Sequence, residues 1–207
     1  MELNELEQQR VEKLQRLRET GASPYPHRVT RTHTLAEAVE AFQAAEAAEV
    51  EPPEVTVVGR LISNRVMGKI AFAHIEDAHG KIQLFLRHNE MDPESYDLFK
   101  KAFDLGDFVE ATGPLMRTRT GEISVLVQEL RMLAKAITPL PIPKEYTDEA
   151  GEATRYSAFS DVEERYRQRY ADLATNPQTR EIFRTRSRTI TALRAWLDAE
   201  DYLEVET

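Results

Sequence analysis

Two neighbouring segments, 70–77 and 81–87, carry residue types whose alternation could bind unpaired nucleic-acid bases. Because successive side chains of a β-strand point to opposite faces, each segment would offer one apolar face and one mixed face. The mixed faces hold two rings, an imidazole, an amide and a cation: Phe72, His74, Gln83, Phe85 and Arg87. Aromatic rings stack on bases, each stack being worth about 1–3 kcal/mol, and amides read base edges. The pattern therefore favours a surface for single-stranded nucleic acid.

The two phenylalanines allow a second interpretation, in which they plug the open ends of a small barrel. Phe72 follows closely on a turn at Gly68 and Lys69, and there we favour base stacking. For Phe85 we favour the barrel plug. His74, taken by itself, is more typical of a surface histidine satisfied within the protein than of a base reader.

Charged residues near these segments could complete such a site. Arg60, Arg65 and Lys69 are expected at or near the first turn, where they could contact phosphates. Glu122 ends a turn at 118–122, and its carboxylate could accept hydrogen bonds from the amino or imino groups of a base. Spacing alone, however, favours a solvated hairpin tip for this residue.

Composition excludes several other kinds of protein. The 207 residues hold 27 Lys and Arg against 36 Asp and Glu, a net charge of −9, so bulk charge cannot hold nucleic acid. The absence of Cys rules out disulfides, zinc fingers and a thiol nucleophile. No glycine-rich phosphate loop, metalloprotease motif or credible Ser/His/Asp grouping occurs, and the five His lack metal-ligand spacing. With no signal peptide or membrane-spanning run, we expect a cytoplasmic protein without a membrane partner.

The elements that would position the site lie between residues 54 and 137. Three strand-like segments are followed by a helical segment and then by two more strand-like segments. They span 55–66, 70–77, 81–87, 93–103 (the helix), 108–117 and 123–133. This order is typical of an OB-fold, a five-stranded barrel that binds oligonucleotides on the face of its second and third strands.

The segments on either side are expected to be mostly helical. Residues 1–53 should form two helices, the second opened by a capping box of Thr34 and Glu37. Residues 138–164 should be a linker that contains a polar loop at 145–154.

Residues 165–207 should begin a further domain. A helix is expected to start at Asn176 and Pro177, and a strand to begin at 203–206. Because one helix and one strand bury too little core, we expect the sequence to be the front end of a longer protein.

Many runs of residues, in order, resemble the N-terminal part of class II lysyl-tRNA synthetases. The resemblance covers essentially the whole chain, and its most discriminating stretch is 165–173. The other matching runs are 13–26, 59–60, 65–72, 80–84, 105–107, 120–124, 139–141, 183–187 and 202–207. Two departures are that residues 144–162 lengthen the usual link and that Asp201 stands where the family usually has Gly.

The resemblance implies an α+β protein with N-terminal helices, a five-stranded OB-fold β-barrel, and then the first helix and strand of a truncated class II catalytic domain. Its domains would be an N-terminal helical extension (1–53), an anticodon-binding OB-fold (54–137), a linker or insertion (138–164) and the start of the catalytic domain (165–207).

Carried over position by position, the resemblance implies that Phe72 stacks on an anticodon base, that Gln83 and Glu122 read uracil edges, and that Arg65 lies close to the bound loop. The expected anticodon site is Arg65, Phe72, His74, Gln83 and Glu122, with Arg60 and Lys69 as phosphate contacts. The expected dimer contacts are Arg165, Tyr166, Arg169 and Tyr170.

The same resemblance implies a homodimeric enzyme that attaches lysine to its tRNA with ATP and Mg²⁺ and has no DNA partner. The residues that bind ATP, magnesium and lysine would lie beyond this sequence. We therefore expect no catalytic residue, metal or cofactor in this chain, and no aminoacylation by the chain alone.

Three other hypotheses stay open. The chain could be a stand-alone OB-fold module that binds RNA, or a relative of aspartyl- or asparaginyl-tRNA synthetases, which share the OB architecture. It could also be a subunit-interface protein, with the apolar stripe at 183–197 as a dimer seam and the charges of 165–170 paired across it.

Overall fold

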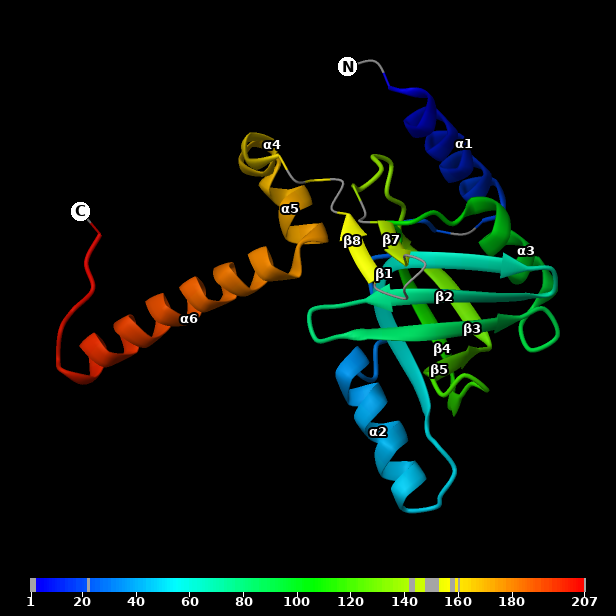
Figure 1. The fold of residues 1–207 in the computed structure, drawn as a ribbon, viewed down its shortest axis with the longest axis horizontal. Helices are drawn as coiled ribbons and strands as arrows, with labels where there is room; N and C mark the ends of the chain where they lie inside the picture. Colours follow the sequence, from blue (N-terminus) through cyan, green and yellow to red (C-terminus); the bar gives the residue numbers. More distant parts are fainter. Residues whose placement is uncertain are drawn as a thin grey trace. The chain divides into compact units, whose positions relative to one another are not determined.

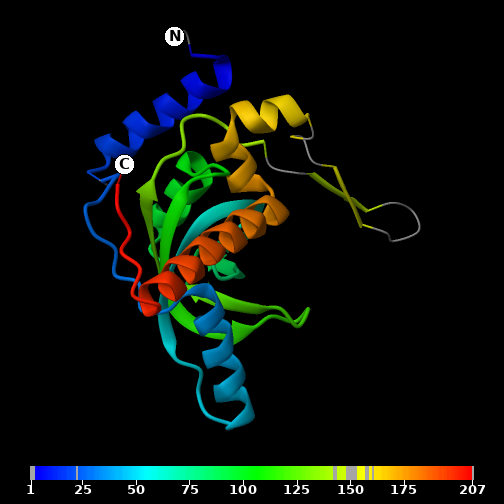
Figure 2. The ribbon, with the colours of Figure 1, turned by 90° about the vertical axis from the view of Figure 1, so that its left-hand side faces the viewer.

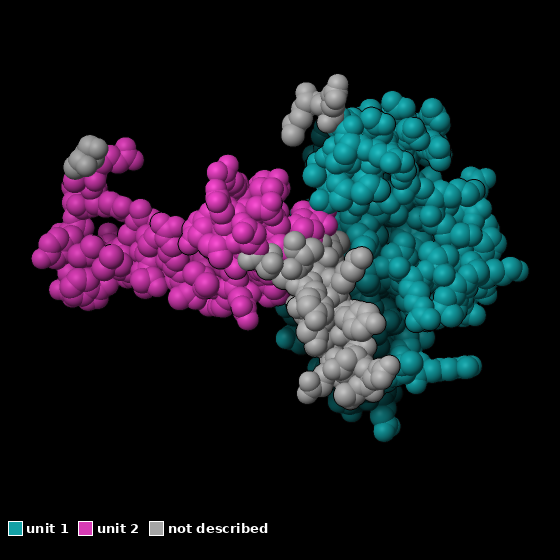
Figure 3. Space-filling view, turned by 45° about the horizontal axis from the view of Figure 1, so that its top comes forward, with its two compact units in different colours: residues 1–139 teal, residues 140–207 magenta. Residues whose placement is uncertain are grey.

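The computed structural model describes residues 3–21, 23–141, 144–147, 153–156, 159 and 161–206. The chain divides into two compact units, residues 1–139 and 140–207 (Figure 3). The first unit holds a closed ring of strands with helices around it, and the described part of the second is mainly helical.

Six strands build the sheet of the first unit, in the order β1-β2-β3-β5-β4-β6 (Figure 1). Because β4 also pairs with β1, the strands β1, β2, β3, β5 and β4 close into a ring. The β3–β5 pair is parallel and the other pairs are antiparallel. The strand bounds are β1 Glu54–Met67, β2 Ile70–Glu76, β3 Lys81–Arg87, β4 Phe108–Arg117, β5 Ile123–Val127 and β6 Glu129–Ala134.

One predicted strand, 123–133, is two strands. It is interrupted at Gln128, because β5 pairs with β3 and β4 whereas β6 pairs with β4 alone. The break lets one continuous segment serve both the ring and its edge, which a single straight strand could not do.

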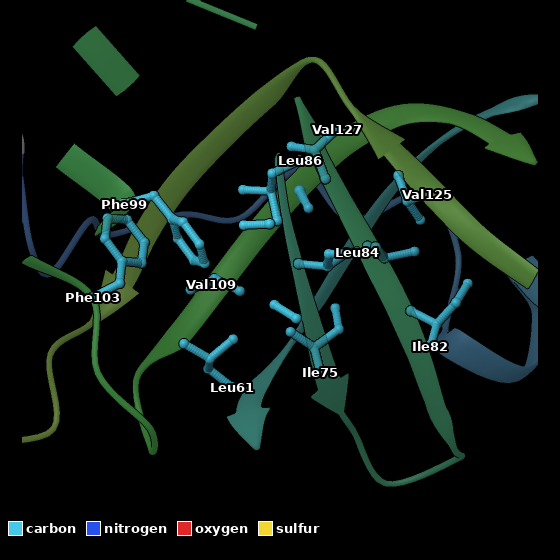
Figure 4. Packing of buried hydrophobic residues seen from close by; sticks show 14 of the residues in the cluster. Leu61, Ile75, Ile82, Leu84, Leu86, Phe99, Phe103, Val109, Val125 and Val127 are labelled. Atoms are coloured by element: carbon cyan, nitrogen blue, oxygen red, sulfur yellow. The ribbon is translucent and has the colours of Figure 1, made fainter. Parts of the chain in front are cut away.

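The predicted alternation of β2 and β3 is confirmed by the core. The six small or aliphatic residues of the inner faces are at most 3% exposed: Ala71, Ala73, Ile75, Ile82, Leu84 and Leu86. Ile75, Leu84 and Leu86 belong to the same hydrophobic cluster as Val109 of β4, Phe99 and Phe103, and Figure 4 labels these members. Phe99 belongs to α3 (Pro93–Ala102), which therefore contributes to the core between β3 and β4.

The two N-terminal helices form as predicted. α1 (Glu5–Glu19) ends before Gly21, whose φ of +79° is the left-handed conformation that glycine adopts easily. α2 (Leu35–Ala47) begins with the predicted capping box, in which Thr34 and Glu37 each bond the other's backbone N–H. α1 and α2 lie at opposite ends of the first unit in both ribbon views (Figures 1 and 2).

A charge cluster fastens α1 to the barrel. Lys135 is fully buried, and its Nζ lies 2.6 Å from Asp104 Oδ2 and 2.8 Å from Asp107 Oδ2. Lys13 of α1 reaches Asp104 Oδ1 from the other side at 2.6 Å. Arg10 adds hydrogen bonds to the carbonyl oxygens of Leu105 and Ala136. These contacts give α1 a fixed position that its modest apolar face would not supply alone.

The second unit differs from the prediction in two places. The expected loop at 145–154 contains an antiparallel pair, β7 (Lys144–Thr147) and β8 (Ala153–Tyr156); residues 148–152 lie outside the described residues. The expected strand at 203–206 is not formed within the described residues. A strand needs a neighbour to bond its backbone groups, and the described part of the unit offers none there.

Three helices make up most of the described part of the second unit: α4 (Val162–Arg167), α5 (Arg169–Thr175) and α6 (Pro177–Ala199). α6 begins after Asn176 as predicted, but the Asn176 side chain does not cap it. Its amide nitrogen donates to Asp172 Oδ1 at 2.6 Å, a bond that fixes the orientation of the side chain. No helix in the described ranges is both long and apolar enough to cross a membrane.

Candidate nucleic-acid interface

Strand register arranges the predicted site residues in two rows across the outer face of β1, β2 and β3. The first row is Arg65, Phe72, Phe85 and Leu126, and the second is Ser63, His74, Gln83 and Ser124. Partners directly opposite on neighbouring strands share a face and lie within about 5.5 Å. These three strands run side by side in Figure 1. Register thus brings Arg65, Phe72, His74 and Gln83 onto one surface.

The two phenylalanines form a parallel stack on this surface. The ring centroids of Phe72 and Phe85 lie 4.8 Å apart with an interplanar angle of 6°. Both rings are half-buried and outside the buried core, so the interpretation of Phe85 as a barrel plug is wrong. Cross-strand pairing explains the stack, because Phe72 stands directly opposite Phe85. The guanidinium of Arg87 lies 5.9 Å from the Phe85 centroid. Two stacked rings make a firmer apolar platform than one.

Next to the platform, five side chains form one hydrogen-bonded network centred on Glu122. Glu122 Oε1 lies 2.8 Å from His74 Nε2, and Gln83 Nε2 donates to Glu122 Oε2 at 2.7 Å. Ser63 Oγ lies 2.7 Å from His74 Nδ1, and Ser124 Oγ donates to Gln83 Oε1 at 2.8 Å. Glu122 is therefore more than a solvated hairpin tip, although its side chain is 43% exposed.

The turn that carries Glu122 is itself tied down. Thr118 N–H donates to the Glu122 carbonyl oxygen at 2.9 Å, and Gly121 adopts a φ of +90° that permits the tight turn. Arg117 donates from Nη1 to the Gly121 carbonyl oxygen at 2.8 Å and holds both carboxylate oxygens of Glu46 on α2. The hydrogen bond from Arg117 lowers the pKa of Glu46. The helix α2 thereby braces the Glu122 turn.

The arrangement can recognise one kind of base edge. A ring platform adjoins a carboxylate acceptor and an amide N–H donor, which come from neighbouring strands and the 118–122 turn. Uracil presents a complementary pair, an N3–H donor beside a carbonyl acceptor. Unpaired bases are recognised by stacking combined with hydrogen bonds to such edges. The geometry therefore suits an unpaired base with an N–H donor beside a carbonyl acceptor, which uracil offers at N3 and O4 and guanine at N1 and O6.

The predicted phosphate contacts are only partly assembled. Arg65 lies in the row of the phenylalanines, and Lys69 lies in the exposed β1–β2 turn. Arg60 was expected near that turn, but it pairs with Glu76 at the opposite end of β2. Its guanidinium lies 4.4 Å from the centroid of the Phe108 ring. The error arose because β1 is long and Arg60 lies well before the turn.

The predicted dimer contacts of the second unit are partly engaged within the chain. Arg165 Nε bonds Asp172 Oδ1 at 2.9 Å, and Arg169 bonds the other oxygen of the same carboxylate. Burial raises the pKa of Asp172, but hydrogen bonds from Asn176 and Arg165 outweigh burial and leave the pKa lowered. Tyr166 and Tyr170 are 72% and 67% exposed. The two arginines thus have structural partners, while the two tyrosines face outward.

Sequence reasoning missed two members of the site, Ser63 and Ser124, and misinterpreted a third, Phe85. Ser63 follows a β-bulge after Leu61, which breaks the alternation expected for β1. Ser124 meets Gln83 only through the parallel β3–β5 pairing, and no short-range pattern encodes that pairing. Phe85 was placed on the mixed face but interpreted as a barrel plug. Its position opposite Phe72 follows once the β2–β3 turn is placed at 77–80, and that position favours the stack.

Comparisons with known proteins match both units of the chain. Residues 55–133 match the family described as "OB-fold nucleic acid binding domain", and residues 161–207 match "tRNA synthetases class II (D, K and N)". A lysine–tRNA ligase of Roseiflexus sp. (strain RS-1) is 46% identical over 209 residues, which cover 100% of this chain and 40% of the relative.

Two further relatives give the same result. The lysine–tRNA ligase of Chloroflexus aurantiacus is 47% identical over 208 residues, covering 100% of this chain and 39% of the relative. That of Burkholderia ambifaria (strain MC40-6) is 44% identical over 206 residues, covering 99% and 38%. The chain thus spans about two fifths of the length of these relatives.

Proposed function

The chain belongs, over its 207 residues, to the family of class II lysyl-tRNA synthetases, and from that premise we propose that its OB-fold unit binds the U-rich anticodon loop of a lysine tRNA. The observation that carries the proposal is the joint placement of a ring stack, an amide and a carboxylate on one face of the sheet. The two rings are half-buried, the Glu122 side chain is 43% exposed and Gln83 is 7% exposed. These are the groups needed to stack an unpaired uracil and to read its edge.

Each predicted site residue has a place in this proposal. Phe72 is packed against the Phe85 ring on one side and stacks on one anticodon base with its other side. Gln83 and Glu122 bond a uracil edge. Arg65 lies beside the bound loop, while Lys69 and Arg60 contact phosphates at the two ends of the face. His74 belongs to the site through Glu122.

The activity of the whole protein is proposed on the same basis. We propose that the full enzyme attaches lysine to its tRNA in the cytoplasm, as a homodimer with contacts at Arg165, Tyr166, Arg169 and Tyr170. The class II synthetase family implies ATP and Mg²⁺ for that reaction. Within the described ranges no group of three or more His, Cys, Asp or Glu could hold a metal ion.

The proposed domains follow one another along the sequence. Residues 1–53 form a helical extension, 54–137 the anticodon-binding domain, 138–164 a linker and 165–207 the start of the catalytic domain. The two family matches, 55–133 and 161–207, support the second and fourth of these segments.

The experiment that tests anticodon binding uses the 207-residue chain and a short RNA hairpin with UUU in its loop. Phe72→Ala should weaken binding, measured by fluorescence anisotropy, by about 1–3 kcal/mol. Phe72→Leu keeps an apolar side chain but offers no ring, so it should lose a comparable amount while its circular dichroism stays that of the wild type.

Two outcomes would contradict the proposal. Unchanged affinity in both variants would show that Phe72 does not stack on a base. A hairpin with GUC in the loop that binds better than the UUU hairpin would favour a relative of the aspartyl-tRNA synthetases, which the matched class II family also covers.

A further inference from the structure

His74 has no ring nitrogen left for a base. Nε2 lies 2.8 Å from Glu122 Oε1 and Nδ1 lies 2.7 Å from Ser63 Oγ. A carboxylate accepts hydrogen bonds, so Nε2 carries a proton and donates it in either charge state of the ring. In the neutral ring, Nδ1 then accepts from the Ser63 hydroxyl. The imidazole is thus held on one side by Ser63 and points its N–H at Glu122 on the other.

The Glu122 carboxylate is held from two directions. His74 donates to Oε1, and Gln83 donates to Oε2 at 2.7 Å. Gln83 is itself fixed, since Ser124 donates to its amide oxygen at 2.8 Å. A glutamate that is 43% exposed would otherwise sample several rotamers in water. Without the bond from His74, the carboxylate could turn about its remaining bond to Gln83.

A fixed carboxylate decides which pyrimidine is accepted. Uracil places an N3–H where cytosine has the bare N3 lone pair, and cytosine carries an amino group where uracil has the O4 carbonyl. A carboxylate held opposite position 3 accepts the uracil N3–H and repels the cytosine lone pair. A carboxylate that is free to move can shift to accept the cytosine amino group instead. Selectivity for uracil therefore depends on the orientation of Glu122 as well as on its presence.

We propose that His74 is a positioning residue that orients Glu122 and thereby sets the preference of this site for uracil over cytosine. This assignment rests on the proposed function, because it assumes that Gln83 and Glu122 bond a uracil edge. His74 contacts no base. Ser63 acts one step further away, by fixing the ring orientation of His74.

The test compares two substitutions of His74, by Asn and by Gln, whose side-chain amides differ in reach by one methylene group. His74→Asn places its amide near the position of Nδ1, where it can reach Ser63 but not Glu122. His74→Gln places its amide nitrogen near the position of Nε2, where it can still donate to Glu122. His79→Asn is the matched control, because His79 is an exposed histidine in the neighbouring β2–β3 turn.

The measured quantity is the ratio of affinities for the UUU hairpin and for three hairpins in which one uridine is replaced by cytidine. At the most selective position, the wild type should prefer uridine by tenfold or more, since one base-edge contact discriminates by about 1–3 kcal/mol. His74→Asn should lower this ratio about fivefold, the equivalent of about one hydrogen bond. His74→Gln should keep the ratio within about twofold of the wild type, and His79→Asn should leave it unchanged.

A second probe identifies the bond. With 3-methyluridine at the selective position, the N3–H is missing. The wild type should then bind the modified hairpin no better than the cytidine hairpin, and His74→Asn should lower the ratio of these two affinities little further. The assignment is overturned if His74→Asn keeps the wild-type ratio, or if His74→Gln loses as much as His74→Asn. A wild type that shows no preference for uridine at any position would instead overturn the proposed function, and this assignment with it.

Discussion

Removing the buried ammonium of Lys135 should destabilise the first unit far more than removing the ammonium of Lys13, although both bind Asp104. The substitutions are Lys135→Met and Lys13→Met, which keep most of the apolar stem and delete the charge. Lys135 and Asp107 are both fully buried, whereas the Lys13 side chain is 29% exposed. Both ammonium groups lie 2.6 Å from an oxygen of Asp104, and Lys135 differs from Lys13 by its burial and by its second bond, to Asp107.

The expected magnitudes follow from these surroundings. Deleting one partner of a buried ion pair typically costs about 3–5 kcal/mol, because the remaining charge stays buried and unpaired. Asp107 would keep two backbone donors, Asp104 N–H at 2.7 Å and Ala136 N–H at 2.8 Å. These donors place the expected loss for Lys135→Met near the lower end, at about 3 kcal/mol. For Lys13→Met we expect at most about 1 kcal/mol, as for exposed pairs.

The assay is urea unfolding followed by far-UV circular dichroism. With a urea dependence of about 2 kcal/mol per molar, the midpoint should fall by about 1.5 M for Lys135→Met and by no more than about 0.5 M for Lys13→Met. If the two midpoints agree within about 0.5 M, burial of the Lys135 ammonium does not determine its contribution and the reasoning fails.

Two further predictions concern the same unit. Burial raises the pKa of Asp104, but hydrogen bonds from Lys13 and Lys135 outweigh burial and leave the pKa lowered. The ionised carboxylate therefore stabilises the fold above about pH 4, and this contribution is lost as the pH falls through the folded-state pKa. The stability difference between the wild type and Asp104→Asn should therefore shrink between about pH 5 and pH 3 in urea titrations, and a difference that grows would contradict the sign. Gly113→Ala should cost about 3 kcal/mol or more, because a Cβ there would overlap the Leu126 carbonyl oxygen where β4 meets β5. Gly21→Ala meets no atom and should lose only about 1 kcal/mol from its positive φ, so equal losses in thermal unfolding would refute the overlap argument.

Short-range patterns predicted much of the first unit. The alternation of 70–77 and 81–87 predicted which side chains enter the core, since neighbours in a strand must face opposite ways. The capping box of Thr34 and Glu37 likewise depends only on residues three apart, and both of its bonds are present. Such features are encoded by the local chain and therefore can be read from it.

Features that depend on distant partners could not be read in this way. Gln83 meets Ser124 because β3 pairs in parallel with β5, across a helix and another strand. Lys135 is buried only because Asp104 and Asp107 lie within reach of its ammonium. In both cases a tertiary contact, and no local pattern, determines where the side chain lies.

The charge distribution is compatible with the proposed RNA-binding surface, although the chain as a whole is acidic. The chain carries a net charge of −9, yet the outer face of β1–β3 holds four cations near the carboxylates of Glu76 and Glu122: Arg60, Arg65, Lys81 and Arg87. Local potential, which falls off over about 10 Å in ordinary salt, matters more to a bound loop than distant acidic residues do.

The negative charge of Glu122 also affects the proposed binding of RNA. Its carboxylate repels phosphates, so it lowers affinity for RNA in general, and only a base that donates a hydrogen bond to it offsets that cost. A site built in this way gains affinity from rings and cations but gains selectivity from a negative charge held in one place. The rigidity of that charge, supplied by His74, Gln83 and the Arg117 brace, is thus as much part of recognition as the charge itself.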